Sequence, residues 1–355
     1  MSSIVVIDNG TFMIKAGLAS DDAPRNVFPA IVSRIDEQVL VGDKASSQSS
    51  MSHPIERGIV KDWEDMEKVW HHTFYEELRI APEEYSILLT EPANNPKVNR
   101  EKTTEIMFEK FNAPSLFLAS QEALSLVASG RSTGLVLNCG EEICRAVPIC
   151  EGHVLPHAIC ELEIGGKTLT DFLIKLLEQR GYCFSNTSSE LEVVRDIKEK
   201  LTFVSLDFEN EPPQTVNDSD SNEWGRQINI GNERFTCPEA LFKPSLVGLD
   251  DWPGIDEIVF NSIVKCELEL RLELYKNIVL AGGCSMFEGL GERLRRRLKE
   301  FIPIATPLKV VAPPERKYSA WIGGSIYSQS LQDRDWMDKM DYDEFGPAVV
   351  HRKCF

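Results

Sequence analysis

The sequence predicts an α/β protein made of two similar halves around a cleft. An apolar run that ends in an acid, a glycine turn and a return run occupies residues 4–17, and much the same order recurs at residues 134–148. Apolar strand runs alternate with segments of helical periodicity after each of these hairpins. The chain of 355 residues also exceeds the size at which one hydrophobic core usually stops growing. Two halves that each offer a hairpin to the same ligand would form a clamp.

The first hairpin has the residues needed to hold a phosphate. The apolar run 4–7 predicts a buried strand, and Gly10 permits a tight turn whose N–H groups can face an anion. Lys15 adds a cation, and Asp8 adds a carboxylate for a metal-bound water. A strand, turn and strand with one glycine is more often plain sheet architecture. The second copy of the pattern is therefore what favours a phosphate site.

The first half continues as an alternation of strands and helices. Gly130 supplies the left-handed residue with which many helices end. Such alternation favours a partly parallel sheet, in which ligands bind at the strand ends. Strands are expected at residues 27–32, 38–42, 86–91 and 115–119, and helices at 63–78, around 106–111 and at 121–129.

The second half repeats this plan after its hairpin. A capping box at residues 189–192 predicts the start of a helix that carries Arg195, Lys198 and Glu199 on one polar stripe. Such a mixed stripe is usually solvated. The basic run 293–299 is likewise interpreted as a solvated helix face. The other elements expected here are a helix at 167–180, an exposed loop at 209–225, an apolar run with a glycine turn at 277–287, a strand at 308–311 and a helix from 321 to 327.

Composition excludes several classes of function. A net charge of −18 and a pI near 4.9 make binding to nucleic acid or to an anionic membrane unfavourable. No apolar run reaches 18 residues, and the start of the chain has no secretory signal pattern, so we expect a protein that stays inside the cell. Nine cysteines without regular spacing are expected to be reduced, packed thiols rather than disulfides or zinc ligands.

Several long stretches of the chain resemble the actin and actin-related protein family, and the resemblance covers nearly the whole sequence. It implies an actin-like ATPase fold, with two similar α/β halves around a nucleotide cleft that holds ATP and Mg²⁺ (or Ca²⁺). We expect residues 1–128 plus 319–355 to form the smaller half, with 30–52 as a shortened distal subdomain. Residues 129–318 would form the larger half, with 165–250 as its distal subdomain. The stretches are 21–25, 66–75, 195–201, 313–319 and 350–355.

The resemblance also implies which residues bind and act on the nucleotide. Asp8 would reach the metal through water, and Gln121 would position the attacking water. Asn138 stands at a third catalytic position in degenerate form. The charged stripe then faces the nucleoside instead of solvent. The implied nucleotide-binding residues are Gly10, Thr11, Phe12 and Lys15 of the first hairpin, Gly140, Glu141, Glu142 and Ile143 of the second, and Gly166, Arg195, Lys198, Glu199, Gly282, Gly283, Cys284, Ser285, Met286, Phe287 and Lys317 around the nucleoside.

Departures from the family pattern concentrate in the second hairpin. Phe12 replaces a glycine of the first hairpin, whereas Asn138 and Glu141 each replace an aspartate, Glu142 a glycine and Arg145 a histidine of the second. If Glu142 faced a phosphate at about 4 Å, the repulsion would be roughly 4 kcal/mol; alternatively its side chain points to solvent and leaves its N–H in use. Losing water-orienting groups slows hydrolysis by on the order of 10²- to 10⁴-fold. We therefore expect ATP binding with slow or absent hydrolysis, at most a weak ATPase.

Two surface features bear on assembly. By the resemblance, we expect the exposed loop that docks into the next filament subunit to be shorter by about ten residues around 37–41, and we expect no counterpart of the family's acidic N-terminal tail. An apolar groove between the halves could still take an amphipathic partner helix. The groove residues are Val127, Ala128, Ile322, Ile326 and Tyr327.

These features leave more than one function open. The leading interpretation is a cytoskeletal, cytoplasmic actin-like protein that binds Mg-ATP and takes part in filament assembly or capping. Its partners would be itself, other actin-family subunits and actin-binding proteins. The alternative is a non-polymerising subunit, locked in one nucleotide state inside a larger complex of a dynactin-like or nuclear kind. A small-molecule kinase has little support, because no acid beyond Asp8 is available as a general base.

Overall fold

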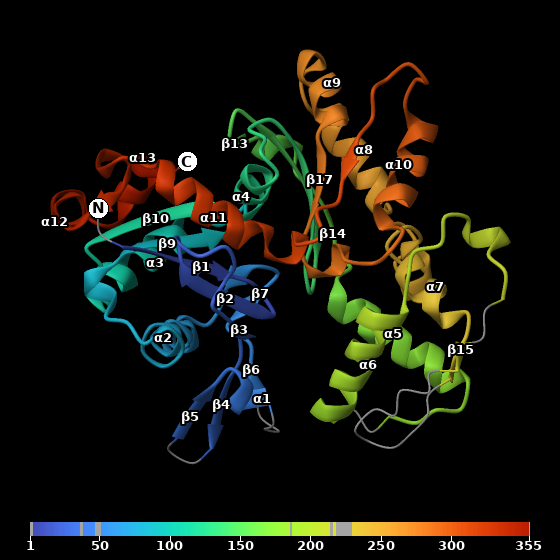
Figure 1. Cartoon of the computed structure of the whole chain (residues 1–355), viewed down its shortest axis with the longest axis horizontal. Helices are drawn as coiled ribbons and strands as arrows, with labels where there is room; N and C mark the ends of the chain where they lie inside the picture. The colour runs from blue at the N-terminus through green and yellow to red at the C-terminus, as the bar shows by residue number, and fades with distance from the viewer. Residues whose placement is uncertain are drawn as a thin grey trace.

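The computed structural model describes residues 3–35, 38–46, 51–184, 187–213, 216–217 and 229–354. The chain forms two halves side by side, each with a central sheet against which helices pack (Figure 1). Each half has its own hydrophobic core. The predicted α/β fold class is confirmed.

The smaller half is built on a sheet with the strand order β19-β10-β9-β1-β2-β3. Its core includes the fully buried rings of Trp70, Phe74 and Trp321. Its strands are β1 (Ile4–Asn9), β2 (Met13–Leu18), β3 (Asn26–Pro29), β9 (Ser86–Glu91), β10 (Ser115–Ser120) and β19 (Met337–Asp338), and its helices are α2 (Trp63–His71), a π-helical continuation (His72–Leu78), α3 (Lys97–Glu109), α11 (Ser319–Ser330), α12 (Lys339–Phe345) and α13 (Val350–Lys353).

A small outlying sheet extends from this half. The sequence predicted one strand over residues 27–32, and this is wrong: the chain leaves the main sheet at Pro29, which has no N–H to donate, and starts a new strand at Val32. The shortened loop predicted around residues 37–41 includes Glu37, which lies outside the described residues. The outlying elements are β4 (Val32–Ile35), β5 (Gln38–Val41), α1 (Asp43–Ser46) and β6 (Met51–Ser52), followed by the hairpin of β7 (Ile55–Glu56) and β8 (Ile59–Val60).

The larger half has the strand order β13-β12-β11-β17-β18, with β14 paired to β12. Helix α6 is capped by Thr187, whose hydroxyl accepts from the N–H of Glu190, so the predicted capping box at 189–192 is wrong by two residues. The strands are β11 (Gly134–Cys139), β12 (Cys144–Cys150), β13 (His153–Val154), β14 (Cys160–Leu162), β17 (Ile278–Ala281) and β18 (Val310–Val311), with β15 (Val216–Asn217) paired to β16 (Asn229–Ile230) apart from them. The helices are α5 (Gly166–Gln179), α6 (Ser188–Leu201), α7 (Glu233–Glu239), α8 (Ile255–Lys265), α9 (Leu268–Lys276) and α10 (Leu290–Phe301), and α4 (Gln121–Ala128) leads into this half from the smaller one.

The two sheets repeat the same pairing pattern. Strand β1 pairs antiparallel with β2 and parallel with β9, which in turn pairs parallel with β10. Strand β11 pairs antiparallel with β12 and parallel with β17, which in turn pairs parallel with β18. The predicted repeat of the hairpin is therefore a repeat of the whole sheet topology, and the two glycine turns occupy corresponding corners.

Two crossing helices join the halves. Helix α4 leads from β10 of the smaller sheet to β11 of the larger one, and α11 brings the chain back after β18. Where they cross, a Cβ added to Gly323 would lie 1.8 Å from the carbonyl oxygen of Leu124, so only glycine allows this approach. The two helices that join the halves are therefore packed backbone to backbone at this crossing.

Among the described residues, none of the helices has the length and apolar character needed to cross a membrane. Six of the nine cysteines are buried, as expected of packed thiols, and that all nine are reduced stays a prediction. The domain boundaries at 128/129 and 318/319 stay a prediction.

Candidate functional site in the interdomain cleft

Both oxygens of the Asp8 carboxylate are hydrogen-bonded within the site. Its Oδ2 accepts from Lys15 Nζ at 2.9 Å, and its Oδ1 accepts from Thr90 Oγ1 at 2.7 Å and from Gln121 Nε2 at 3.0 Å. Asp8 is only 3% exposed. Three donors from three different elements therefore fix both oxygens of a buried acid and hold the carboxylate in one orientation.

The fold brings these residues together through strand pairing. Lys15 lies directly across from Asp8 in the β1–β2 pair, and Thr90 is the fifth residue of β9, which runs parallel to β1. Gln121 is the first residue of α4, and its amide also donates to the carbonyl of Asn9 at 3.0 Å. The structure brings together Asp8, Lys15 and Gln121, which the sequence predicted as site residues. It adds Thr90, which reaches Asp8 only through the parallel pairing of β9 with β1.

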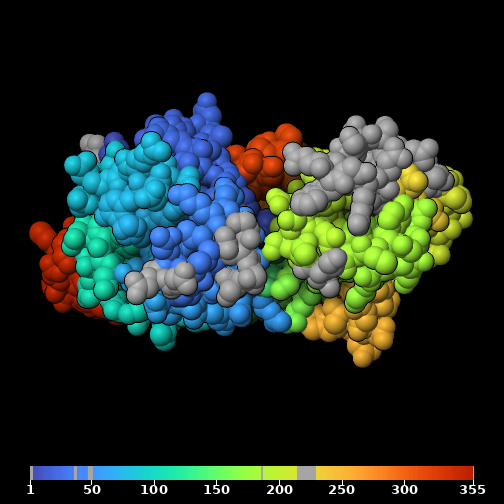
Figure 2. Space-filling view, turned by 90° about the horizontal axis from the view of Figure 1, so that it is seen from below, coloured from blue at the N-terminus to red at the C-terminus, as the bar shows by residue number. Residues whose placement is uncertain are grey.

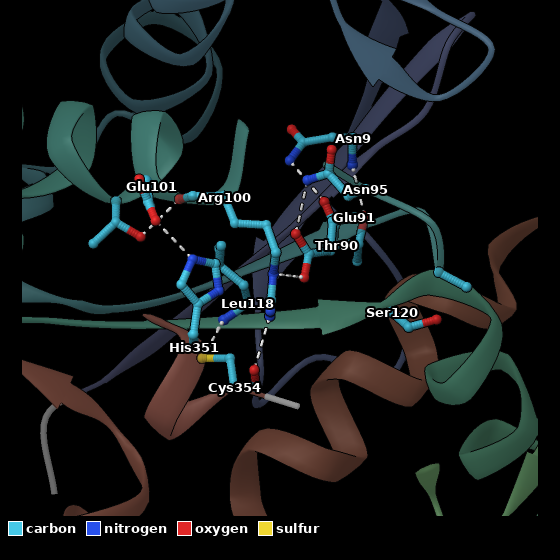
Figure 3. Close-up of polar contacts among 12 residues, drawn as sticks. Asn9, Thr90, Glu91, Asn95, Arg100, Glu101, Leu118, Ser120, His351 and Cys354 are labelled. Atoms are coloured by element: carbon cyan, nitrogen blue, oxygen red, sulfur yellow. Dashed lines mark hydrogen bonds and ion pairs between the residues drawn. The ribbon is translucent and has the colours of Figure 1, made fainter. Parts of the chain in front are cut away.

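The C-terminal segment supports the corner that carries Thr90. Arg100 donates to the carboxylate of Glu91 at 2.8 Å and to the carbonyl of Cys354 at 2.9 Å (Figure 3). Beside Arg100, Nε2 of His351 lies 2.8 Å from Oε1 of Glu101. Burial raises the pKa of Glu91, and Arg100 opposes that effect. Arg100 of α3 thus ties Glu91, the residue after Thr90, to Cys354, which follows the last helix.

The second hairpin closes through Gly140, whose N–H donates to the carbonyl of Ile143 at 2.9 Å. Asn138, at the position matching Asp8, donates its amide to Glu122 Oε1 at 3.1 Å. Glu122 is fully buried, and its other oxygen accepts from the N–H of Ala93 and from the hydroxyl of Ser120. Sequence reasoning missed Glu122, although a charged residue directly after Gln121 in an otherwise apolar helix was a usable signal.

Glu141 and Phe12 meet through Arg195. The guanidinium of Arg195 lies over the Phe12 ring, 3.8 Å from its centroid, and Nη2 donates to Glu141 Oε1 at 3.1 Å. Burial raises the pKa of Glu141, and Arg195 and Lys198 oppose that effect. The structure therefore links the two hairpins through one cation from α6, with a ring on one side and a carboxylate on the other.

Glu142 takes neither of its two predicted orientations. Its Oε2 accepts at 2.7 Å from the backbone N–H of Arg57, which lies in the turn between β7 and β8 of the smaller half. The Arg57 guanidinium in turn contacts both oxygens of Glu163, at 2.5 and 3.0 Å. Arg145 donates to the carbonyl of Arg57 at 2.6 Å and to Glu161 at 2.6 Å. Arg57 and Glu163 were not identified from the sequence.

The residues expected around the nucleoside are placed less uniformly. Lys198 is buried and donates to the carbonyl of Gly166 and to the hydroxyl of Thr170, at 2.7 and 2.8 Å. Glu199 and Lys317 are exposed, and Lys317 Nζ lies 4.8 Å from the Tyr318 ring centroid. Of the glycine turn, Cys284, Ser285 and Phe287 are buried, whereas Gly283 and Met286 are exposed and Gly282 has a φ of +86°.

The residues predicted to line a partner groove lie on the two crossing helices. Val127, Ala128, Ile322 and Tyr327 are half-buried, and Ile326 is exposed. Tyr327 packs against Phe117, with ring centroids 5.8 Å apart, and burial raises its pKa. The five residues therefore share one region of the fold, at the crossing of α4 and α11.

The residues fit a metal-bound polyphosphate on one side of the cleft better than on the other. Asp8 and Lys15 supply a hard oxygen donor and a cation. Arg195 Nε is a buried donor without a partner in the protein, so it could donate a hydrogen bond to a bound ligand. A Cβ added to Gly283 would meet nothing within 4 Å, so the glycine turn faces open space there. The polar groups of the second hairpin, by contrast, are already bonded within the protein.

A family model described as actin matches residues 1–355, the whole chain. Members of that family generally bind ATP with a divalent cation. They typically interact with other actin-family subunits and with binding proteins.

Proposed function

The chain belongs to the actin family, and from that premise we propose that it binds Mg-ATP in the interdomain cleft and hydrolyses it slowly or not at all. The observation that carries this proposal is the network around Asp8, whose buried carboxylate is held by Lys15, Thr90 and Gln121. A bound Mg²⁺ (or Ca²⁺) would neutralise phosphate charge. Asp8 would hold the metal's water, and Lys15 would face the phosphate.

Retention of the nucleotide is supported by the donors that remain. Arg195 Nε has no partner in the protein, although it is buried. An acceptor from a nucleoside or phosphate would remove the penalty of that unmade bond, which is about 1–3 kcal/mol. The Phe12 ring covers one face of the same guanidinium and fixes its plane. We therefore assign Arg195 to holding the nucleotide.

Loss of hydrolysis is supported by the second hairpin. Asn138 cannot accept a proton, and its amide is committed to Glu122. Arg145 has a nearly buried side chain and is committed to Glu161 and to the carbonyl of Arg57. Neither residue is free to orient or deprotonate a water. Of the residues implied for hydrolysis, Gln121 could still orient a water, but an amide cannot deprotonate it.

Extraction of the co-purifying nucleotide, followed by a single-turnover assay with radiolabelled ATP, tests both parts. We expect ATP to remain bound after long incubation, with hydrolysis on the order of 10²- to 10⁴-fold slower than that of ordinary actin. Asp8→Asn should abolish metal-dependent binding, whereas Glu292→Gln, a surface change in α10, should leave it intact. Failure to bind Mg-ATP at millimolar concentration, or hydrolysis at the rate of ordinary actin, would refute the proposal.

A second candidate is a cytoplasmic or nuclear subunit that does not polymerise and keeps one nucleotide state inside a larger complex. The contacts of Arg57 across the cleft favour it, because they hold the halves together without a ligand. The filament interpretation instead relies on actin-family subunits as partners and on the groove at α4 and α11. Sedimentation with Mg-ATP, alone and mixed with ordinary actin, separates the two: a protein that never pellets is not a filament subunit.

A further inference from the structure

We infer that this cleft is held closed by the chain's own side chains, so that closure does not depend on a bound nucleotide. The device is the Arg57 bridge, which we define as Arg57, Glu142, Arg145 and Glu163. The inference rests on the proposed function only where it concerns nucleotide release. Figure 2 shows the two halves in contact on the face seen from below.

All the hydrogen-bonding groups of one turn residue are used in this bridge. The N–H of Arg57 donates to Glu142, its carbonyl accepts from Arg145, and its guanidinium makes a two-pronged contact with Glu163. All three partners belong to the larger half, whereas the β7–β8 turn is fixed to the smaller core by the fully buried Ile55. One residue thus carries four contacts across the cleft.

The same turn also reaches the first hairpin. Gly58, the residue after Arg57, donates its N–H to Thr11 Oγ1 at 2.8 Å. The route from Thr11 through Gly58 and Arg57 to Glu142 therefore joins the two glycine turns by protein contacts alone. This is the connection that a phosphate tail gripped by both hairpins would otherwise provide.

The turn is held in a conformation that needs these partners. Arg57 has a φ of +50°, in the left-handed region that residues with a Cβ rarely adopt. Such a conformation persists where the surroundings over-determine it. The bonds to its N–H and carbonyl fix the peptide groups on both sides, so Arg57 is positioned by the larger half as well as by its own.

Further contacts beside the Arg57 bridge also join the two halves. Glu161 accepts from Arg145 and also from Asn94 of the smaller half, at 2.6 and 2.9 Å. The Arg145 side chain is only 5% exposed. Opening the cleft would separate this buried cation from the carbonyl of Arg57 and pull Glu161 away from Asn94. Arg145 would keep Glu161, which lies in the same half, but it would lose the carbonyl of Arg57, and breaking a hydrogen bond of a charged group opposes opening.

Scattering and nucleotide release test the inference on the whole chain. Nucleotide is removed with EDTA and apyrase, and the radius of gyration is measured by small-angle X-ray scattering with and without Mg-ATP. The test variant is Glu142→Gly combined with Glu163→Gln, which removes the acceptors of the Arg57 N–H and guanidinium. The control is Glu292→Gln, because Glu292 is also paired with arginines, Arg295 and Arg296, but within one helix of one half.

We expect the unchanged protein and the Glu292→Gln control to keep the same radius of gyration without nucleotide. The double variant should expand when nucleotide is removed, and it should release a fluorescent ATP analogue about tenfold faster. Glu163→Gln alone, a conservative change at a half-exposed site, should shift release in the same direction by a smaller factor. Expansion of the unchanged protein on nucleotide removal, or a double variant that stays compact and releases at the original rate, would overturn the inference.

The two proposals fail separately. If the chain binds no ATP, the proposed function is wrong, but the scattering comparison between the unchanged protein and the double variant still decides the bridge. If ATP binds but the nucleotide-free protein expands, the bridge is wrong and the proposed function stands. Circular dichroism of each variant at the same temperature separates opening of the cleft from loss of folding.

Discussion

Replacing Glu239 by glutamine should make the stability of the protein less dependent on pH. Glu239 is fully buried and contacts Arg293 at 3.1 Å, and its Oε2 has no partner. Burial raises the pKa of Glu239 to about 7, helped by Asp256 and opposed by Arg293, Lys243 and Arg297. The unfolded carboxyl titrates at its ordinary value near 4.5. The folded state therefore holds a proton that the unfolded state has lost between these two values.

The sign of the effect follows from that difference. A raised pKa contributes stability that is present below about 4.5 and is lost as pH rises through about 7. The shift corresponds to on the order of 3 kcal/mol, which in a chain of this size is about 4 °C in Tm. Glutamine mimics the protonated acid, so the Tm of Glu239→Gln relative to the unchanged protein should rise by about that amount between pH 5 and pH 8.

Differential scanning fluorimetry at half-unit pH steps measures this, at a fixed scan rate and with nucleotide removed. The matched control is Glu233→Gln, because Glu233 also pairs with an arginine, Arg180, but at the surface. Its Tm difference from the unchanged protein should stay nearly constant over the same pH range. A constant Tm difference for Glu239→Gln would refute the reasoning, since it would mean that Glu239 stays ionised beside Arg293 throughout.

Two further predictions concern packing. Gly323→Ala should destabilise the protein by more than about 3 kcal/mol, because the new Cβ would lie 1.8 Å from the Leu124 carbonyl oxygen at the helix crossing. The control is Gly291→Ala, whose new Cβ would lie 3.5 Å from its nearest neighbour. In thermal melts, the control should leave the Tm unchanged or raised. Burial raises the pKa of Cys237 and Cys354 to about 12. Iodoacetamide at pH 8 should therefore label the exposed Cys183 and leave Cys237 and Cys354 unlabelled until urea is added, as measured by mass spectrometry of the digested protein. Labelling of Cys237 before urea is added would contradict its burial.

The repeat of the sheet plan could be predicted because the residues of each hairpin are consecutive in the sequence. Asp8 and Lys15 are local to the first hairpin, so their pairing across the turn follows from residue order. Thr90 and Glu122 could not be found in the same way. Thr90 reaches Asp8 only because β9 lies parallel to β1, and Glu122 reaches Asn138 only because α4 passes between the halves. Pairings over such separations depend on tertiary geometry, to which local patterns do not respond.

The orientation of the Glu142 side chain could not be predicted for a different reason. The sequence indicated its charge and its place in the turn, and the expected neighbours were a phosphate or water. The structure gives it a third neighbour, the N–H of Arg57, 85 positions earlier in the chain. A backbone donor has no signature in the sequence, because every residue except proline has one. The orientation of Glu142 was therefore outside what residue types could predict.

The departures in the two hairpins are better explained as an altered site than as a decaying one. A hairpin that had merely lost its ligand would leave buried polar atoms without partners. Each departing residue instead has one: Phe12 and Glu141 meet Arg195, Asn138 meets Glu122, Glu142 meets Arg57 and Arg145 meets Glu161. Among the described residues, the buried side-chain atoms without a partner are five, and Arg195 Nε is the one that belongs to this set of contacts. That atom is a donor next to the first hairpin, so under the proposed function a nucleotide would supply its acceptor. The residues at the positions implied for hydrolysis in the second hairpin already hydrogen-bond within the protein.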